Sequence, residues 1–278
     1  MIKDLIKKVP PLFYVFSKLY RGNIAFSYYK KPLKNIVKWL FTSKETTNFT
    51  FPISEMNKQY LASLIATIAK TNYNTVYGYF TEIEEDKNLR NHLAKAIKNS
   101  SRNFVTDPYP LYGRRIGWYA FVRILKPKIV IETGVEKGLG SCVLTCALKK
   151  NDEEGFKGYY YGTDINPEAG FLFGGEYKKY GEILYGDSIT SLKKLECNID
   201  LFINDSDHSA DYENDEYMTI YKQLSENAII LGDNSHCTTK LLEFSRLMKR
   251  QFIFFKEEPE NHWYPGAGIG ISFKNELR

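Results

Sequence analysis

Short apolar runs alternate with helix-like segments between residues 115 and 275 of the chain. The runs cover residues 128–132, 159–164, 182–185, 200–203, 228–231, 251–255 and 268–273. Continuous apolar runs of this length are typical of strands buried on both faces of a sheet, with helices as the crossover connections. The pattern therefore predicts an α/β fold in which a seven-stranded, parallel-rich sheet carries helices on both faces.

The segment before this predicted sheet follows a helical period instead. Ser54 suits the N-cap position of a helix, and Leu61, Leu64, Ile65 and Ile68 follow at helical spacing. A second helix is expected over residues 84–98. We therefore expect a basic, mostly helical N-terminal extension or cap over residues 1–105, and a second domain containing the sheet over residues 106–278.

The charge is distributed unevenly along the chain, whose formal net charge is +5. Residues 1–44 carry ten Lys or Arg and a single acidic residue, Asp4, whereas the rest of the chain carries 28 basic and 32 acidic residues. The part that contains the predicted sheet is therefore slightly acidic. Because like charges repel, such a domain is a poor binder of nucleic-acid phosphates, and no nucleic-acid partner is expected.

The basic N-terminal segment also contains many aromatic and aliphatic residues. It has two interpretations: a helix that lies on a membrane surface or an acidic partner, and a docking segment whose lysines are solvated. Pro10, Pro11, Gly22 and Pro32 are expected to break any long helix in this region. Peripheral membrane contact through residues 1–44 and assembly into a homo-oligomer both stay open.

Targeting signals and cysteine spacing indicate the compartment. The sequence has no run of 18 apolar residues and no uninterrupted apolar segment at its N-terminus, so we expect a cytoplasmic location, with or without membrane association. Cys142, Cys146, Cys197 and Cys237 do not have the spacing of a zinc site. They are therefore expected to be buried free thiols in a reducing compartment.

A glycine-rich turn follows the first predicted strand. It runs from Glu132 through Gly134, Gly138 and Gly140 to Ser141, directly before a helical stretch. Glycines let a ligand approach the backbone closely, and the helix start offers free amide groups. Ordinary turn chemistry is the alternative for this segment taken alone.

The next two predicted strands also end in polar residues. Asp164 ends the second strand, and Asp187 and Ser188 follow the third. An acidic residue at the end of the second strand is suited to accept hydrogen bonds from ribose hydroxyls. Polar residues at three neighbouring strand ends therefore predict a ligand that contains a nucleoside, although a helix cap would also explain each residue by itself.

Carboxylates follow the fourth and fifth predicted strands. Asp205 and Asp207 come after the fourth strand, and Asp233 and Asn234 after the fifth. Asp205, Asp233 and Asn234 together offer the oxygen ligands that Mg²⁺ prefers, so the sequence predicts a divalent cation there. Which of Asp205 and Asp207 binds it stays open.

Two histidines compete for the role of general base. His208 lies three residues after Asp205, and His236 lies two residues after Asn234. A histidine titrates near neutral pH and is suited to remove a proton from a hydroxyl group. His208 is the preferred candidate because it is placed to reach a group bound beside Asp205.

Residues 128–234 resemble the class I S-adenosylmethionine-dependent methyltransferases, and most closely their metal-dependent O-methyltransferase branch, which includes the catechol and macrolide-sugar enzymes. The resemblance rests on the turn from Glu132 to Ser141, on Asp164, on the Gly186-Asp187-Ser188 turn, and on Asp205 with Asp233-Asn234. It implies a Rossmann-like sheet of seven strands, the last of them antiparallel. It also implies S-adenosylmethionine as cofactor, with Mg²⁺ or another divalent cation.

The resemblance assigns a role to each of these positions. The cofactor-binding residues would be Glu132, Gly134, Gly138, Ser141, Asp164, Asp187, Ser188 and Asp205; the metal ligands would be Asp205, Asp233 and Asn234; and the base would be His208. The expected reaction is methyl transfer to a hydroxyl group of a small molecule or sugar. Aromatic segments at residues 109–112 and 262–264 are candidates for acceptor recognition or for core packing, and Arg114 and Arg115 for binding a carboxylate or phosphate.

Other functions on a similar fold stay open. A nucleic-acid or other N-methyltransferase is suggested only by a partial match at residues 107–110. A dinucleotide oxidoreductase would not explain the carboxylates after the fourth and fifth strands. A cephalosporin-hydroxylase-like enzyme and a non-catalytic protein that retains the fold are the remaining alternatives.

Overall fold

The computed structural model describes residues 10–274 of the chain. Its contacts divide the chain into two compact units. One contains the described residues up to Ser43 together with Asn261–Pro265, and the other contains Lys44–Glu260 and the residues from Gly266 onward. The predicted boundary at residue 105 does not coincide with this division, because residues 44–105 share the second unit with the sheet.

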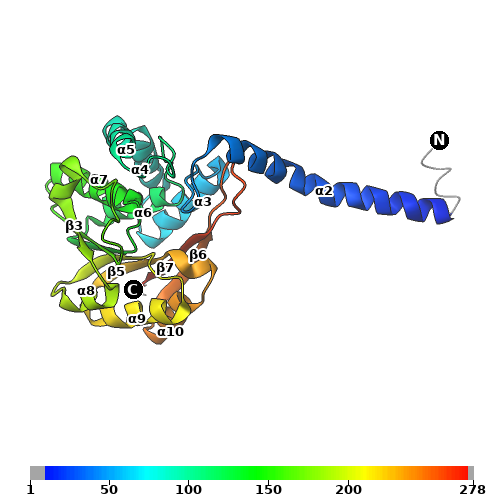
Figure 1. The fold of residues 1–278 in the computed structure, drawn as a ribbon. Helices are drawn as coiled ribbons and strands as arrows, with labels where there is room; N and C mark the ends of the chain where they lie inside the picture. Colours follow the sequence, from blue (N-terminus) through cyan, green and yellow to red (C-terminus); the bar gives the residue numbers. More distant parts are fainter. Residues whose placement is uncertain (1–9, 275–278) are drawn as a thin grey trace. The chain divides into compact units, whose positions relative to one another are not determined.

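The second unit is built on one seven-stranded sheet (Figure 1). Its strands are β1 (Ile129–Thr133), β2 (Tyr159–Asp164), β3 (Gly181–Tyr185), β4 (Ile199–Asn204), β5 (Leu224–Gly232), β6 (Gln251–Lys256) and β7 (Gly268–Phe273). Their order across the sheet is β3-β2-β1-β4-β5-β7-β6. The strands β1 to β5 are parallel, whereas β7 runs antiparallel to both β5 and β6. The predicted α/β fold, with an antiparallel last strand, is confirmed.

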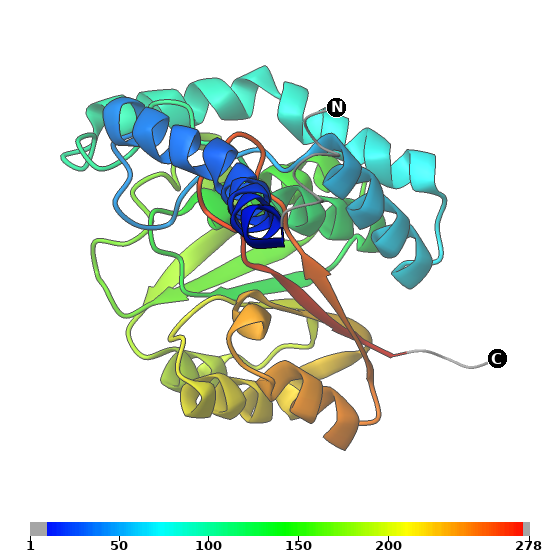
Figure 2. The same cartoon turned by 90° about the vertical axis from the view of Figure 1, so that its right-hand side faces the viewer.

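Helices cover both faces of this sheet (Figure 2). The helices α6 (Arg115–Leu125) and α7 (Leu139–Glu153) lie on one face, and α8 (Ser188–Lys194), α9 (Ala210–Ile220) and α10 (Lys240–Leu247) lie on the other. Three short 3-10 helices, η1 (Gly175–Tyr180), η2 (Tyr221–Gln223) and η3 (Asp233–His236), complete the connections.

The strand residues alternate between two hydrophobic cores. In β4, Leu201 and Ile203 belong to the core under α6 and α7, whereas Phe202 belongs to the core under α8 to α10. In β1, Val130 and Ile131 divide in the same way. Because successive side chains of a strand point to opposite faces, a sheet covered on both sides needs apolar residues at every position. This is why continuous apolar runs predicted the strands correctly.

Residues 44–105 add three helices to the face that α6 and α7 cover. These are α3 (Glu55–Ile68), α4 (Tyr73–Glu85) and α5 (Lys87–Asn99). Ser54 is the N-cap of α3, as predicted, and its side chain accepts a hydrogen bond from the Asn57 amide. The expected second helix begins later, at Lys87, because the Asp86 side chain accepts a hydrogen bond from the Leu89 amide at 2.8 Å and so caps α5. The helix α4 lies between these two expected helices, in a part of the chain that was predicted to be mostly helical, but it was not predicted as a separate helix.

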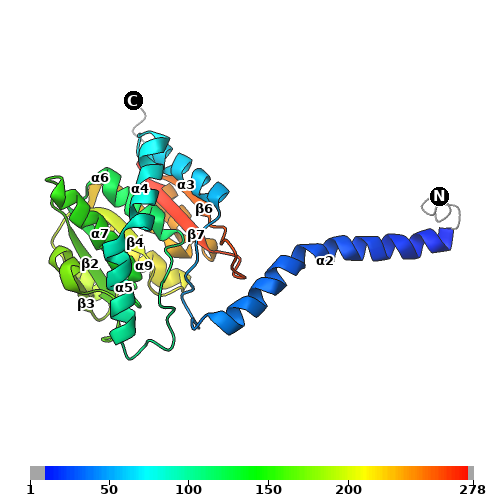
Figure 3. The same ribbon diagram turned by 90° about the horizontal axis from the view of Figure 1, so that it is seen from above.

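The other unit consists mainly of α2 (Pro10–Thr42), a helix of 33 residues that bends along its length (Figure 3). The prediction that prolines and glycine break the helix is wrong. Pro10 and Pro11 lie in the first turn, where backbone amides have no helical partner, so they cost no hydrogen bond. Only Pro32 lies inside the helix, where proline bends the helix without ending it.

Short contacts join α2 to residues 261–265 of the same unit. The Asn35 side-chain amide donates a hydrogen bond to the His262 carbonyl at 3.2 Å, and the rings of Trp39 and Trp263 meet edge to face with centroids 5.3 Å apart. Trp263 was a candidate for acceptor recognition. Its packing against Trp39 is the alternative that the sequence left open.

The cysteines are free thiols, as predicted. Cys142 and Cys146 are buried in α7, whereas Cys197 is half-buried and Cys237 is exposed, so the expectation of burial is correct for two of the four. None of the helices within residues 10–274 is long and apolar enough to cross a membrane.

Candidate functional site

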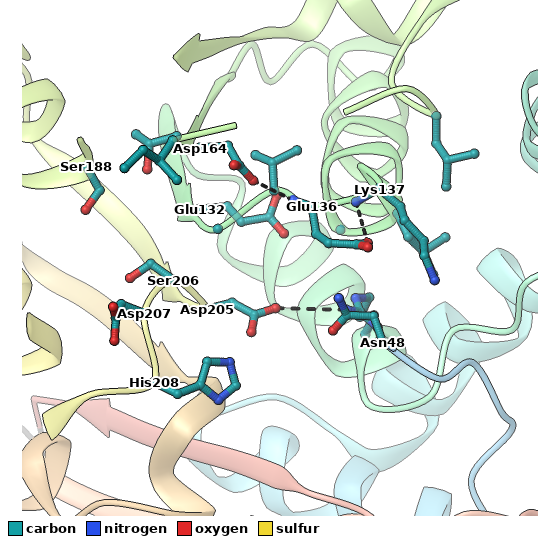
Figure 4. Close-up of a pocket in the computed structure, with 18 of the residues that line it drawn as sticks. Asn48, Glu132, Glu136, Lys137, Asp164, Ser188, Asp205, Ser206, Asp207 and His208 are labelled. Carbon is teal, nitrogen blue, oxygen red and sulfur yellow. Dashed lines mark hydrogen bonds and ion pairs between the residues drawn. The ribbon is translucent and has the colours of Figure 1, made fainter. Parts of the chain in front are cut away.

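A cavity of about 440 Å³ lies at the carboxyl ends of the parallel strands, which is the size range of small-molecule sites (Figure 4). The strand order reverses between β1 and β4, and ligands of open α/β sheets bind at such a switch point. The lining residues used below are Thr106, Arg115, Glu132, Gly134, Thr163, Asp164, Asp187, Ser188, Asp205 and His208. Residues 48, 50 and 137 also reach it.

Two glycines make the turn after β1 possible. Gly134 has a φ of +83°, and a Cβ there would overlap the carbonyl group of Asp205. Gly140, at the start of α7, packs directly against the carboxylate of Glu132, which any Cβ would displace. The turn thus brings β1, β4 and α7 closer together than side chains would allow. Gly138 and Ser141 are not among the residues that line the cavity.

Glu132 is a buried carboxyl group at the end of β1, with 2% of its surface exposed. Its Oε2 accepts hydrogen bonds from the hydroxyl groups of Tyr160 and Ser141. Burial raises the pKa of Glu132 to about 7, against the opposing effect of the Tyr160 hydrogen bond and of Arg115. The group is therefore poised to change its protonation state near neutral pH.

Asp164 closes the turn at the end of β2. Its two carboxylate oxygens accept hydrogen bonds from the backbone amides of Glu136 and Asn166, each at 2.8 Å. Each oxygen of a carboxylate can accept a second hydrogen bond, so the side chain retains acceptor capacity toward the cavity that it lines.

The residues after β3 have mainly structural contacts. Asp187 is the N-cap of α8 and accepts hydrogen bonds from the Thr190 amide and the Tyr212 hydroxyl, both at 2.7 Å. These hydrogen bonds lower its pKa. The Ser188 hydroxyl is buried and bonded to Glu216 and Tyr212. Ser188 therefore helps to shape the wall of the cavity, and its hydroxyl group is already engaged.

Glu216, which the sequence did not single out, forms hydrogen bonds with residues at several strand ends. Its carboxyl group accepts hydrogen bonds from four side chains: Thr133, Ser188, Asn204 and Ser206. Its pKa is raised by burial, although these hydrogen bonds oppose the shift. A lone glutamate inside a helix gives no signal of such a role, because the four donors come from three different strand ends.

The predicted metal ligands meet two arginines. The Arg114 guanidinium donates to both carboxylate oxygens of Asp233 and lies 3.1 Å from Oε1 of the buried Glu257. Nη2 of Arg115 lies 3.9 Å from Oδ2 of Asp205. Burial acts to raise the pKa of Asp233, but the charge of Arg114 outweighs it, so that this pKa is lowered. Burial and the negative charge of Asp233 hold the pKa of Asp205 well above its usual range.

The chemistry of this group fits a divalent cation poorly. Oδ1 of Asn234 is buried without a hydrogen-bond partner among the described residues, as an oxygen ligand would be. Both oxygens of Asp233, however, are bound by a guanidinium that cannot be deprotonated, and the second arginine adds a further positive charge. Within residues 10–274, no group of three or more His, Cys, Asp or Glu side chains is arranged to hold a metal.

The two candidate bases differ in access to the cavity. His208 is exposed at its rim and lies beside Asp205 in the wall formed by residues 205–208 (Figure 4). His236 is not among the lining residues, and its Nδ1 lies 3.0 Å from the Asp233 carbonyl oxygen. Asp207 is exposed and accepts a hydrogen bond from the Ser209 amide at 2.6 Å, so Asp205 is the carboxyl group that faces Asp233.

Three buried polar atoms on lining residues have no hydrogen-bond partner among the described residues. They are the hydroxyl oxygens of Thr106 and Thr163 and Nε of Arg115. An unpaired buried polar group costs about 1–3 kcal/mol, which a bound polar ligand would recover. Arg115 therefore stands out as a cationic group in the cavity wall with hydrogen-bonding capacity to spare. The sequence suggested an anion-binding role for it but did not separate it from Arg114.

The structure thus brings Glu132, Gly134, Asp164, Asp187, Ser188, Asp205 and His208 to one cavity, and leaves Gly138, Ser141, Asp233 and Asn234 outside its lining. The roles of both groups of residues in binding a ligand stay predictions.

Residues 131–235 match the family described as "Methyltransferase domain". No curated protein matches the sequence significantly.

Solved structures with a similar fold include three methyltransferases. One from Geobacter sulfurreducens is 17% identical over 69% of this chain and 92% of its own, with a TM-score of 0.48. The O-methyltransferase TomG from Streptomyces achromogenes, solved with S-adenosylmethionine, is 14% identical over 69% and 91%, with a TM-score of 0.46. The methyltransferase PaMTH1 from Podospora anserina is 18% identical over 83% and 100%, with a TM-score of 0.44. Residues 131–235 are therefore similar to a methyltransferase domain, and the order of the strands is that of a methyltransferase-like α/β fold.

Proposed function

We propose that this protein transfers a methyl group from S-adenosylmethionine to a hydroxyl group of a small molecule or sugar. The observation that carries the proposal is the cavity at the switch point, where Glu132, Asp164 and Asp205 meet at neighbouring strand ends. The domain that contains it matches a methyltransferase family. Nucleoside recognition and an acidic, hydrogen-bonding wall are the features that this cofactor requires.

The residues present fit the cofactor in three respects. Asp164 retains acceptor capacity for the ribose hydroxyl groups. Gly134 lets the chain turn at the cavity wall, where a side chain would collide with the backbone of Asp205 in the loop after β4. Arg115 offers an unpaired Nε to the carboxylate of the methionine part, and guanidinium groups match carboxylates in shape and charge.

The chemistry needs alignment and one proton acceptor. When bound, S-adenosylmethionine supplies a methyl group on a positively charged sulfur. The methyl–sulfur bond breaks as the oxygen–methyl bond forms, in line, and the proton of the hydroxyl group passes to a base. His208 at the rim of the cavity is the candidate base. A positioned base typically contributes on the order of 10²–10⁴ in rate.

Metal assistance is not part of this proposal. It was expected from Asp205, Asp233 and Asn234, but Arg114 already binds both oxygens of Asp233. The positive charges of Arg114 and Arg115 balance the carboxylates of this cluster instead. The magnesium prediction therefore stays open to a direct binding test, described below.

The first test is cofactor binding. Isothermal titration of the full chain with S-adenosylhomocysteine should give one saturable site. Asp164→Asn should weaken this binding at least tenfold, because an amide retains one acceptor oxygen where the carboxylate has two. Asp152→Asn, at the end of α7 and away from the cavity, is the matched control. If the chain binds NAD but not S-adenosylhomocysteine, the proposal is wrong.

The second test is acceptor chemistry. A panel of catechols, sugars and amines is incubated with S-adenosylmethionine, and the product is identified by mass spectrometry. We expect methyl ethers, and His208→Ala should lower the rate about 100-fold or more without changing cofactor affinity. Exclusive methylation of amines would instead favour an N-methyltransferase.

A further inference from the structure

The helix α2 carries only positive charge. It contains Lys18, Arg21, Lys30, Lys31, Lys34 and Lys38, and no aspartate or glutamate. Nothing in the proposed methyl transfer uses these residues, since all the residues that line the candidate site lie in the other unit. The positive charge of α2 therefore needs an explanation other than methyl transfer.

Exposed apolar residues form a stripe along one side of α2, interrupted at Gly22 and Asn23. Its members are Val15, Leu19, Phe26, Leu33, Val37 and Leu40, and each has more than half of its surface exposed. Their spacings of three, four and seven residues place them on one side of a helix. From Val15 to Leu40, the stripe is about 38 Å long at 1.5 Å per residue. Large exposed apolar surfaces of this kind mark interaction sites.

Aromatic and basic residues flank this stripe. Tyr14, Tyr20, Tyr28 and Tyr29 are all more than 60% exposed. Tyrosine is enriched at membrane–water interfaces, where its ring lies among the lipid headgroups and its hydroxyl group reaches water. Lysine side chains bury their methylene stems in the same zone and keep their ammonium groups at the phosphates. Apolar stripe, tyrosines and lysines thus form the pattern of a helix that lies flat in a lipid interface.

We propose that α2 binds the surface of an anionic lipid bilayer, with its stripe inserted among the acyl chains and its basic residues at the lipid phosphates. Charge complementarity selects anionic lipid over neutral lipid. The apolar residues of the stripe are spread along the helix, which suits a bilayer surface. A protein groove would instead be expected to bind a few large anchor residues at fixed positions. Surface binding also agrees with the absence, within residues 10–274, of a helix able to span the membrane.

The test measures cosedimentation of the full chain with vesicles. We expect binding to vesicles of phosphatidylcholine with about one third phosphatidylglycerol, weakening as salt is raised, and much weaker binding to pure phosphatidylcholine. Each basic residue near an anionic surface is worth about a fivefold change in affinity. Replacing Lys30, Lys31, Lys34 and Lys38 by glutamine should therefore weaken binding at least a hundredfold.

One control and one further variant make the test specific. The first replaces four exposed lysines of the other unit, Lys157, Lys193, Lys194 and Lys222, by glutamine, which changes the net charge equally and should leave binding within about fivefold of the wild type. The second is the stripe variant Leu19→Gln/Phe26→Gln/Leu33→Gln, which keeps the charge and helix propensity but removes apolar contact. It should also lose most of the binding, while circular dichroism verifies that the helix content is unchanged.

The proposal is overturned if the wild type does not bind anionic vesicles at low salt, or if the stripe variant binds as the wild type does. Light scattering of the lipid-free protein tests the alternative occupant, a second copy of the chain. If the wild type is a dimer and the stripe variant a monomer, the stripe is a subunit interface and the lipid proposal is wrong.

Discussion

Arg114 donates hydrogen bonds to both carboxylate oxygens of Asp233, across 119 positions of sequence. The pair is almost fully buried, and Glu257 completes it. Removing one partner of a buried ion pair leaves an uncompensated charge. Arg114→Met should therefore lower the free energy of unfolding by about 3–5 kcal/mol, as measured by urea denaturation.

The control for this variant is Arg102→Met, which removes a partly exposed arginine paired with Glu168. Exposed ion pairs contribute less than about 1 kcal/mol, so this variant should unfold nearly as the wild type does. Equal losses in the two variants would contradict the importance of the Arg114–Asp233 pair.

A magnesium titration is a second test of the cluster formed by Arg114, Asp233 and Asp205. Because a guanidinium already binds Asp233, titration of MgCl₂ into the protein should give no saturable heat up to millimolar concentrations. The variant Asp205→Asn/Asp233→Asn provides the baseline. A saturable heat that this variant abolishes would restore the magnesium site that the sequence predicts, with Arg114 displaced from it.

Arg115 is expected to recognise the carboxylate of the methionine part of the cofactor. Arg115→Met should weaken S-adenosylmethionine binding about 10- to 100-fold, because a hydrogen bond to a charged group is worth about 1.5–3 kcal/mol. The wild type should discriminate against decarboxylated S-adenosylmethionine by a similar factor, and the variant should not. Discrimination that survives in the variant would assign the carboxylate to another residue.

Glu132 should make stability depend on pH. Its pKa is raised to about 7 in the folded protein, from 4.5, so the folded state holds the proton more tightly than the unfolded state does. The stabilising contribution is complete below pH 4.5 and is lost as the pH rises through about 7. Glu132→Gln mimics the protonated form and removes this loss. The unfolding free energy of the variant should therefore gain about 3 kcal/mol on that of the wild type between pH 4.5 and 8.

Urea denaturation of both proteins across this pH range measures that difference. Glu182→Gln, at a position exposed in β3, is the control and should follow the wild type. Parallel curves for Glu132→Gln and the wild type would mean that Glu132 stays ionised in the folded protein.

Much of the second unit could be predicted from the sequence. A strand buried on both faces must be apolar throughout, so its run ends where the chain reaches the polar edge of the sheet. Asp164, Asp187 and Asp205 stand at such ends, which is why local pattern alone placed them in one cavity.

Only the tertiary structure decided which partners these residues have. Arg114 and Glu216 act on strand ends far away in the sequence, and no local period records a contact of that kind. The sequence therefore predicted oxygen ligands at Asp233 but not the guanidinium that holds them. In α2, proline pattern predicted a break, yet the described helix continues through Pro32, because one lost hydrogen bond bends a long helix without ending it. The pattern of apolar residues along the chain predicts which segments are buried. Charge pairs between residues distant in sequence depend on how the chain folds, so the sequence pattern does not predict them.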